Sequence, residues 1–466
     1  MKELKGLLGD SLVYGLGGIV LRATQILILP LILLFFKKSE FGELDYFLNI
    51  KNILIVIYGF GILTSIFKFS SNSSGKDNVP FVGLLIVLLI ANIGFILLYI
   101  ISCLVGVFNE YKDNILFIQL ISSFGALMTI PLGVFRQKRE PVKYIVLNVI
   151  YTILLLGTSY YLVIKTDLNY KSILIGHVFA SFITFSLGFL YIKKHLIFKF
   201  DKKLFQKMFS FGFSILLNSL SFVILFGTTR FFLKAAGTFD DVGTLGMAQR
   251  ISLFVGAILI SPFSLAWLPF IKANVEKDNF TYITNRVFTS FLWIAFLFVF
   301  ALELIQKDVF LLIDNTEYLP SLKYVLPFSL SYIFQGFYFI FSAGIFLSGN
   351  NKQYRIIGLS SVFFNLLLYF LFYKYISTGI VAIITLASYG CMMILAFLFG
   401  NKKMGIKVIT KQNMKILGLY LSLFFIMKLF LNYDISIVTA FGLKITFLIF
   451  LFSIHVYYEK RRPFIL

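Results

Sequence analysis

Long apolar segments separated by short polar connections make up almost the whole chain. Stretches of about 20 apolar residues, the length that crosses a bilayer core of roughly 30 Å as a helix, recur fourteen times. The first seven segments cover residues 12–36, 44–67, 80–107, 114–136, 142–164, 171–192 and 209–234. The second seven cover residues 242–271, 284–306, 320–347, 354–375, 378–399, 414–431 and 435–457. The pattern predicts an all-α polytopic membrane protein with about 14 transmembrane helices.

Composition agrees with this class. The 466 residues are 59% hydrophobic and only 14% charged, whereas about a quarter of the residues in soluble domains are charged. The two cysteines, Cys103 and Cys391, lie inside apolar segments, and the three histidines are scattered along the chain. We therefore expect neither a metal site nor a cofactor. The longest polar connections hold about fifteen residues, too few for a separate catalytic domain, so no enzyme activity is expected.

The distribution of Lys and Arg predicts the orientation, because short basic loops stay on the cytoplasmic side. Alternate connections carry 27 basic residues on one side of the membrane and 9 on the other. Both termini are therefore predicted to be cytoplasmic. Most of the net charge of +21 follows from this topology and does not indicate a nucleic-acid partner.

Two short motifs suggest an internal repeat. Residues 39–46 and 240–247 begin two of the segments, and their glycines, Gly42 and Gly243, are 201 residues apart. In both motifs acidic residues precede the glycine, at a helix start where acids suit the helix dipole. We predict pseudo-symmetric six-helix bundles over residues 1–200 and 201–400, followed by a helix pair and tail over 401–466. Such repeats are typical of transporters.

Several basic residues fall inside the predicted helices, where a charge near the bilayer centre costs about 2.5 to 3.5 kcal/mol and usually serves a function. Arg230 is near an external helix end, from which it can also extend to the membrane interface. The others lie about 10 to 15 Å from a helix end, and two glutamines accompany them as polar candidates. The predicted site for an anionic headgroup comprises Arg22, Lys51, Arg230, Arg250 and Lys444, with Gln25 and Gln249.

Acidic residues show the opposite distribution. All 21 are expected at termini, in loops or near segment ends, and Asp45 and Glu303 come nearest to burial. No carboxylate is expected to neutralise the membrane-embedded cations or to carry a coupling sodium ion or proton. A cationic cavity would also repel cationic drugs, so a drug exporter is disfavoured. Because Arg binds phosphate with two donors at once, the pattern favours an anionic lipid headgroup.

The chain resembles the polysaccharide flippases of the MOP exporter superfamily, the Wzx-type O-antigen and capsule translocases. The resemblance covers nearly the whole chain. It rests on residues 14–18, 29–31, 40–42, 209–218, 229–230, 242–243, 247–250, 267–269, 365–368, 379–382, 385 and 388–389. One position departs from the family, in which Asp often precedes the arginine at Arg230; Thr229 stands there instead, which predicts an arginine that no neighbouring acid holds.

The resemblance implies that the protein moves an undecaprenyl-diphosphate-linked oligosaccharide, such as an O-antigen or capsule repeat unit, across the bacterial plasma membrane. It implies alternating access through a cationic central cavity. Expected partners are this lipid-linked oligosaccharide, membrane lipids and a polysaccharide polymerase complex. Two alternatives remain open: flipping of the peptidoglycan lipid precursor or a teichoic-type intermediate, and a membrane-embedded polysaccharide polymerase or ligase.

Overall fold

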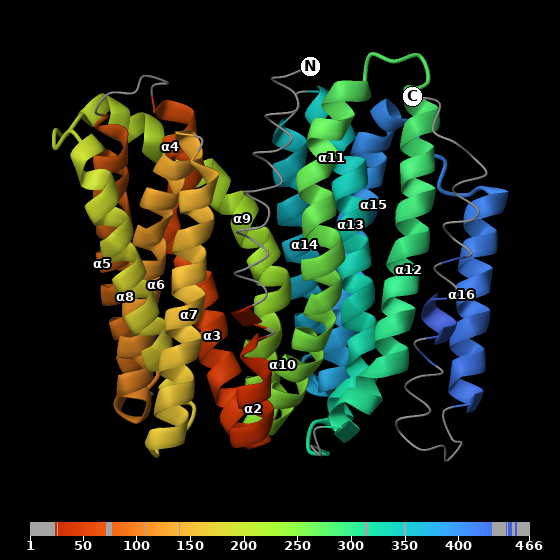
Figure 1. Ribbon diagram of the computed structural model, residues 1–466, viewed down its shortest axis with the longest axis horizontal. Coiled ribbons are helices and arrows are strands. Elements are labelled where there is room, and N and C mark those ends of the chain that lie inside the picture. The colour runs from red at the N-terminus through yellow and green to blue at the C-terminus, as the bar shows by residue number, and fades with distance from the viewer. Residues whose placement is uncertain are drawn as a thin grey trace. The chain divides into compact units, whose positions relative to one another are not determined.

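The computed structural model describes residues 24–25, 27–70, 77–106, 108–138, 140–312, 316–348, 351–430, 444, 446–449 and 453. In these residues the regular structure is helical (Figure 1), apart from one isolated bridge between Asp77 and Leu196. Eleven helical spans among them are long and apolar enough to cross a membrane. The predicted class, an all-α polytopic membrane protein, is confirmed.

Each of the eleven spans coincides with one of the predicted segments from 44–67 to 378–399. The predicted segment 414–431 is also helical, as α16 (Lys411–Phe430). About half of the predicted segment 12–36 and most of the predicted segment 435–457 lie outside the described residues. The chain is therefore a multi-pass membrane protein.

The chain divides into two compact units, and the first comprises Met1–Gly246 and Gly358–Val381. Its helices are α2 (Leu29–Phe35), α3 (Lys38–Gly59), α4 (Ile62–Phe69), α5 (Val79–Leu104), α6 (Phe108–Gln137), α7 (Pro141–Lys165), α8 (Lys171–Ile192) and α9 (Lys202–Ala236), with the first half of α10 (Phe239–Phe254) and most of α14 (Asn351–Leu371). Helix α6 packs against α3, α4, α5 and α8. Within this core Tyr58 is fully buried and donates a hydrogen bond to Gln119 at 2.8 Å.

The second unit comprises Met247–Ile357 and Ala382–Leu466. It contains the end of α10, a π-helix (Val255–Ile260), α11 (Ser261–Asn274), α12 (Phe280–Leu312), a short 3-10 helix (Leu319–Tyr324), α13 (Val325–Ser348), most of α15 (Thr378–Met404), and α16. Helices α13 and α15 cross at two glycines, where a Cβ on Gly344 would lie 1.9 Å from the Gly400 carbonyl oxygen. The predicted symmetric halves, 1–200 and 201–400, stay a prediction.

One predicted helix, 44–67, is broken. The chain leaves α3 and enters α4 through Phe60 and Gly61, whose φ angles of 43° and 64° are left-handed. Helix α9 packs tightly on this break, because a Cβ on Gly212 would lie 2.4 Å from the Phe60 carbonyl oxygen. The break therefore fixes the direction of α4 relative to the first half of α9.

The two repeated motifs begin their helices in the same way. An acid three residues after the cap accepts a hydrogen bond from the cap amide: Glu40 from Lys37 at 3.0 Å in α3, and Asp241 from Thr238 at 2.9 Å in α10. These bonds satisfy amides that a helix start leaves open. Gly42 and Gly243 each follow two residues after the capping acid.

Candidate functional site

Helix α3 crosses the start of α10 with the two backbones in direct contact. A Cβ on Gly42 would lie 1.8 Å from the carbonyl oxygen of Phe239, and a Cβ on Gly243 would lie 2.2 Å from that of Lys38. Gly42 thus faces Phe239, four residues before Gly243, and Gly243 faces Lys38, four residues before Gly42. The two motifs therefore meet at one helix crossing, where only glycine leaves room for the opposing backbone.

A buried ion pair lies beside this crossing. Arg230 of α9 donates from Nε to one Asp45 carboxylate oxygen at 2.9 Å, and its second guanidinium nitrogen lies 2.9 Å from the same oxygen. Arg230 is 8% exposed and Asp45 is 5% exposed. The third guanidinium nitrogen donates to the Phe226 carbonyl at 3.0 Å. The pair connects α3 to α9, and its acid comes close to Gly246 of α10.

One prediction about this arginine is wrong. Arg230 was expected to have no neighbouring acid holding it, because Thr229 replaces the family's aspartate. The acid comes from α3 instead, and Thr229 contributes a hydroxyl oxygen 3.3 Å from the guanidinium. Arg230 is therefore held in an ion pair inside the protein.

Lys444 has a similar environment in the second unit. Its ammonium nitrogen lies 3.0 and 2.8 Å from the two carboxylate oxygens of Asp308 in α12. Asp308 is 5% exposed. The prediction that buried carboxylates do not neutralise the membrane-embedded cations is wrong for Lys444 as it is for Arg230.

Lys51 lies further along α3 and is 8% exposed. Ser122 of α6 donates to its backbone carbonyl at 3.4 Å, so this part of α3 packs against α6. Two residues earlier, Asn49 donates to the Gly227 carbonyl of α9 at 2.8 Å. These contacts place the lysine within a packed, membrane-spanning part of the first unit.

The remaining predicted residues are distributed over both units. Gln249 is buried and Arg250 is half-buried in the part of α10 that belongs to the second unit. Ser252 anchors that segment by donating to the Val325 carbonyl at 3.0 Å. Gln25 is exposed. Arg22 lies outside the described residues, so its predicted role stays a prediction.

A polar cluster at the predicted external side of the first unit was missed by the sequence analysis. Tyr170, between α7 and α8, donates to Glu43 of α3 and accepts from Asn114 of α6 at 2.9 Å. Two effects raise the pKa of the Tyr170 hydroxyl: burial, which is the larger, and the hydrogen bond to the Glu43 carboxylate. The hydroxyl therefore stays protonated and connects three helices.

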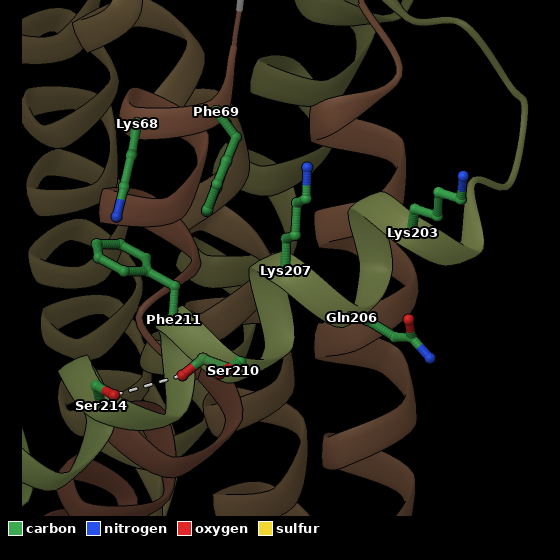
Figure 2. A pocket seen from close by; sticks show the side chains of 8 residues that line it. All are labelled: Lys68, Phe69, Lys203, Gln206, Lys207, Ser210, Phe211 and Ser214. Atoms are coloured by element: carbon green, nitrogen blue, oxygen red, sulfur yellow. Dashed lines mark hydrogen bonds between the residues drawn. The ribbon is translucent and has the colours of Figure 1, made fainter.

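Lys68, Lys203 and Lys207, which belong to the 27 basic residues on the predicted cytoplasmic side, line one cavity. It measures about 620 Å³ and lies between the end of α4 and the first half of α9 (Figure 2). Its lining residues are Lys68, Phe69, Lys203, Gln206, Lys207, Ser210, Phe211 and Ser214. In the part of the chain that the structure describes, no group of three or more His, Cys, Asp or Glu residues is arranged to hold a metal ion.

Solved structures with a similar fold are membrane transporters. The lipid II flippase MurJ, in an inward closed conformation, aligns with a TM-score of 0.75 and 19% identity, over 95% of this chain and 98% of that chain. The MATE multidrug transporter DinF-BH aligns with a TM-score of 0.62 and 16% identity, over 86% and 97%. An outward-facing MATE family transporter of the MOP superfamily aligns with a TM-score of 0.58 and 14% identity, over 87% and 98%.

Sequence comparison gives the family. No curated protein matches the chain. The model of the family described as "Polysaccharide biosynthesis protein" matches residues 7–275, more than half of the 466 residues. This match agrees with the resemblance read from the motifs, and the transporter fold agrees with it independently. The chain belongs to the polysaccharide biosynthesis protein family.

Proposed function

We propose that the protein flips a diphosphate-linked oligosaccharide lipid, an O-antigen or capsule repeat unit on undecaprenyl diphosphate, from the cytoplasmic to the outer face of the bacterial plasma membrane. In this proposal both termini are cytoplasmic, and a polysaccharide polymerase receives the flipped lipid. The observation that carries it is the presence of Lys51 and Arg250 inside membrane-spanning helices in a chain of the polysaccharide biosynthesis family.

The chemistry of these residues suits the diphosphate. Moving a charged headgroup across a bilayer core is costly unless fixed groups of opposite charge meet it. Lys51 and Arg250 supply positive charge at membrane depth, and a planar guanidinium binds two phosphate oxygens at once. We infer that they form part of the path, together with Arg22 and the polar Gln25 and Gln249.

Arg230 and Lys444 receive a different role in this proposal. Each is in contact with a buried carboxylate, Asp45 or Asp308. Breaking such a pair without replacing it leaves a buried charge uncompensated. We infer that these two residues stabilise the helix arrangement, and that they meet the headgroup only in a state in which the pair has opened.

The membrane potential supplies a driving force in this scheme. An anion that leaves a negative interior gains about 2.3 kcal/mol per charge for each 100 mV. Outward flipping of a diphosphate lipid then requires no coupling ion. If the rate of outward lipid flux in proteoliposomes does not change with an imposed membrane potential, the potential is not the driving force. That result would not contradict the proposed flipping itself.

A second candidate substrate is the peptidoglycan lipid precursor, which also carries a diphosphate. The observation that favours it is the fold likeness to a lipid II flippase over 95% of the chain. Complementation separates the two: the protein is expressed in strains that each lack one defined flippase. Restored surface polysaccharide supports the first candidate, and rescued growth of the peptidoglycan strain supports the second. Failure in all strains, with the protein present in the membrane, contradicts both.

A further inference from the structure

The cavity between α4 and α9 has a continuous polar wall. Lys203, Lys207, Ser210 and Ser214 recur at intervals of three or four residues on α9, so they share one face of the helix. This face runs for about 16 Å along the helix, at roughly 1.5 Å per residue. Phe69 and Lys68 of α4 form the opposite wall (Figure 2).

The cavity has a strongly positive lining. Three of its eight lining residues are lysines and none is acidic. Within the described residues, none of the three lysines forms an ion pair with a carboxylate. Asp201, the nearest acid before them on α9, accepts hydrogen bonds from the amides of Lys203 and Leu204 at 2.9 and 3.0 Å. An anion in this cavity would meet positive charge that no carboxylate of the described residues pairs with.

Lys68 is held in place by aromatic rings. Its ammonium nitrogen lies 3.8 Å from the centre of the Phe211 ring and 5.4 Å from that of Phe69. Such cation–π contacts stabilise an ammonium group over the face of a ring. Figure 2 shows the side chain extending from α4 toward Phe211 of α9. The rings direct the charge across the cavity rather than leaving the long side chain to move in solvent.

A close contact between the two helices lies next in the chain to the lining residues Phe211 and Ser214. Gly212, next to Phe211, leaves no room for a Cβ against the Phe60 carbonyl at the α3–α4 break. A Cβ on Gly61 would lie 2.7 Å from the Cβ of Ile215. Helix α4 is therefore anchored to α9 below the lysines, and their arrangement is part of the fold.

The surroundings point to a lipid rather than a soluble anion. Two of the lining residues, Phe69 and Phe211, are aromatic, and the chain close to them exposes further large apolar side chains, Phe67 at 52% and Phe213 at 49%. The basic connections near 68–76 and 193–208 place this end of both helices at the predicted cytoplasmic interface. A ligand with phosphate and an acyl or prenyl tail matches both the lysines and the aromatic lining residues.

We propose that this cavity is a binding site for the phosphate groups of a lipid headgroup at the cytoplasmic face. The lipid is either an anionic phospholipid of the bilayer or a prenyl diphosphate, since both present the same phosphate chemistry to Lys68, Lys203 and Lys207. All its lining residues belong to the first unit. The proposal does not depend on which oligosaccharide lipid the protein flips.

The test is lipid retention by the full chain in neutral phosphatidylcholine nanodiscs, measured by native mass spectrometry with phosphatidylglycerol or farnesyl diphosphate added. K68Q/K203Q/K207Q should weaken binding of at least one of these lipids by about tenfold or more, since basic residues at the membrane surface attract anionic headgroups. K68R/K203R/K207R should keep it. Whichever lipid responds identifies the source of the phosphate.

A matched control removes the same charge elsewhere. Lys402, Lys403 and Lys415 are exposed, lie on the predicted cytoplasmic side and do not line the cavity, so K402Q/K403Q/K415Q should leave retention unchanged. Equal losses in the two Gln triples would overturn the proposal in favour of a general surface charge effect. Retention of neither lipid by the wild type would also overturn it. Complementation activity is scored separately, so that failure of the proposed flipping does not count against the site.

Discussion

Two guanidinium nitrogens of Arg230 in α9 contact the same carboxylate oxygen of Asp45 in α3, each at 2.9 Å. The two residues are 185 positions apart in the chain. Both are more than nine-tenths buried. The pair therefore depends on the packing of α3 against α9, and it reports on whether that packing is maintained.

Removing one member of this pair should be more harmful than removing both. Asp45→Asn leaves the guanidinium buried beside a neutral group, and losing one partner of a buried pair costs about 3 to 5 kcal/mol. Asp45→Asn and Arg230→Gln should each lower the thermal unfolding temperature strongly, and the double variant should recover part of the loss. A double-mutant cycle measures the coupling. Strictly additive effects would show that the pair does not act as a unit.

The crossing of α3 and α10 should tolerate no side chain at Gly42. Gly42→Ala places a methyl group 1.8 Å from the Phe239 carbonyl oxygen if nothing moves, so the two helices must separate. We expect a loss of unfolding temperature and of surface polysaccharide. Gly157→Ala in α7 is the control, because nothing lies within 4 Å of the added Cβ and Ala is favoured over Gly by up to about 1 kcal/mol in a helix. Equal behaviour of the two variants would contradict the close crossing.

Alkaline pH should weaken the cluster around Tyr170. Burial and the Glu43 contact raise the pKa of this hydroxyl above its ordinary value of 10.0. The stabilisation is therefore complete below pH 10 and is lost as the pH rises toward the folded-state pKa. Tyr170→Phe should lower stability at neutral pH and reduce its fall above pH 10, as followed by unfolding temperature against pH. An unchanged alkaline slope in the variant would show that Tyr170 does not contribute.

Membrane spans could be predicted from the sequence because their signal is local. An apolar run of sufficient length identifies a span without knowledge of its neighbours, and eleven of the predicted segments have such a helix in the described residues. The break at Phe60 and Gly61 was missed because the residues around it are continuously apolar. Only the left-handed backbone and the close contact with Gly212 reveal it.

The partners of the charged residues could not be predicted in the same way. Asp45 lies near the end of its predicted segment, where nothing in the sequence marks it as the partner of Arg230, and Thr229 suggested that no neighbouring acid holds that arginine. Which face of α3 meets α9 decides both questions, because this packing brings Asp45 to Arg230. Likewise, the spacing of Lys203 and Lys207 indicates one helix face, but the position of Lys68 opposite them depends on the α3–α4 break.

The most direct test of the proposed function is translocation of a fluorescent undecaprenyl-diphosphate oligosaccharide in proteoliposomes that contain the purified protein. The wild type should move the lipid between leaflets. Lys51→Gln should reduce the rate at least about tenfold, because a cation at membrane depth is lost, whereas Lys165→Gln, an exposed lysine at the end of α7, should not. No translocation above that of protein-free liposomes, or full activity in Lys51→Gln, would contradict transport of a diphosphate lipid through a cationic path.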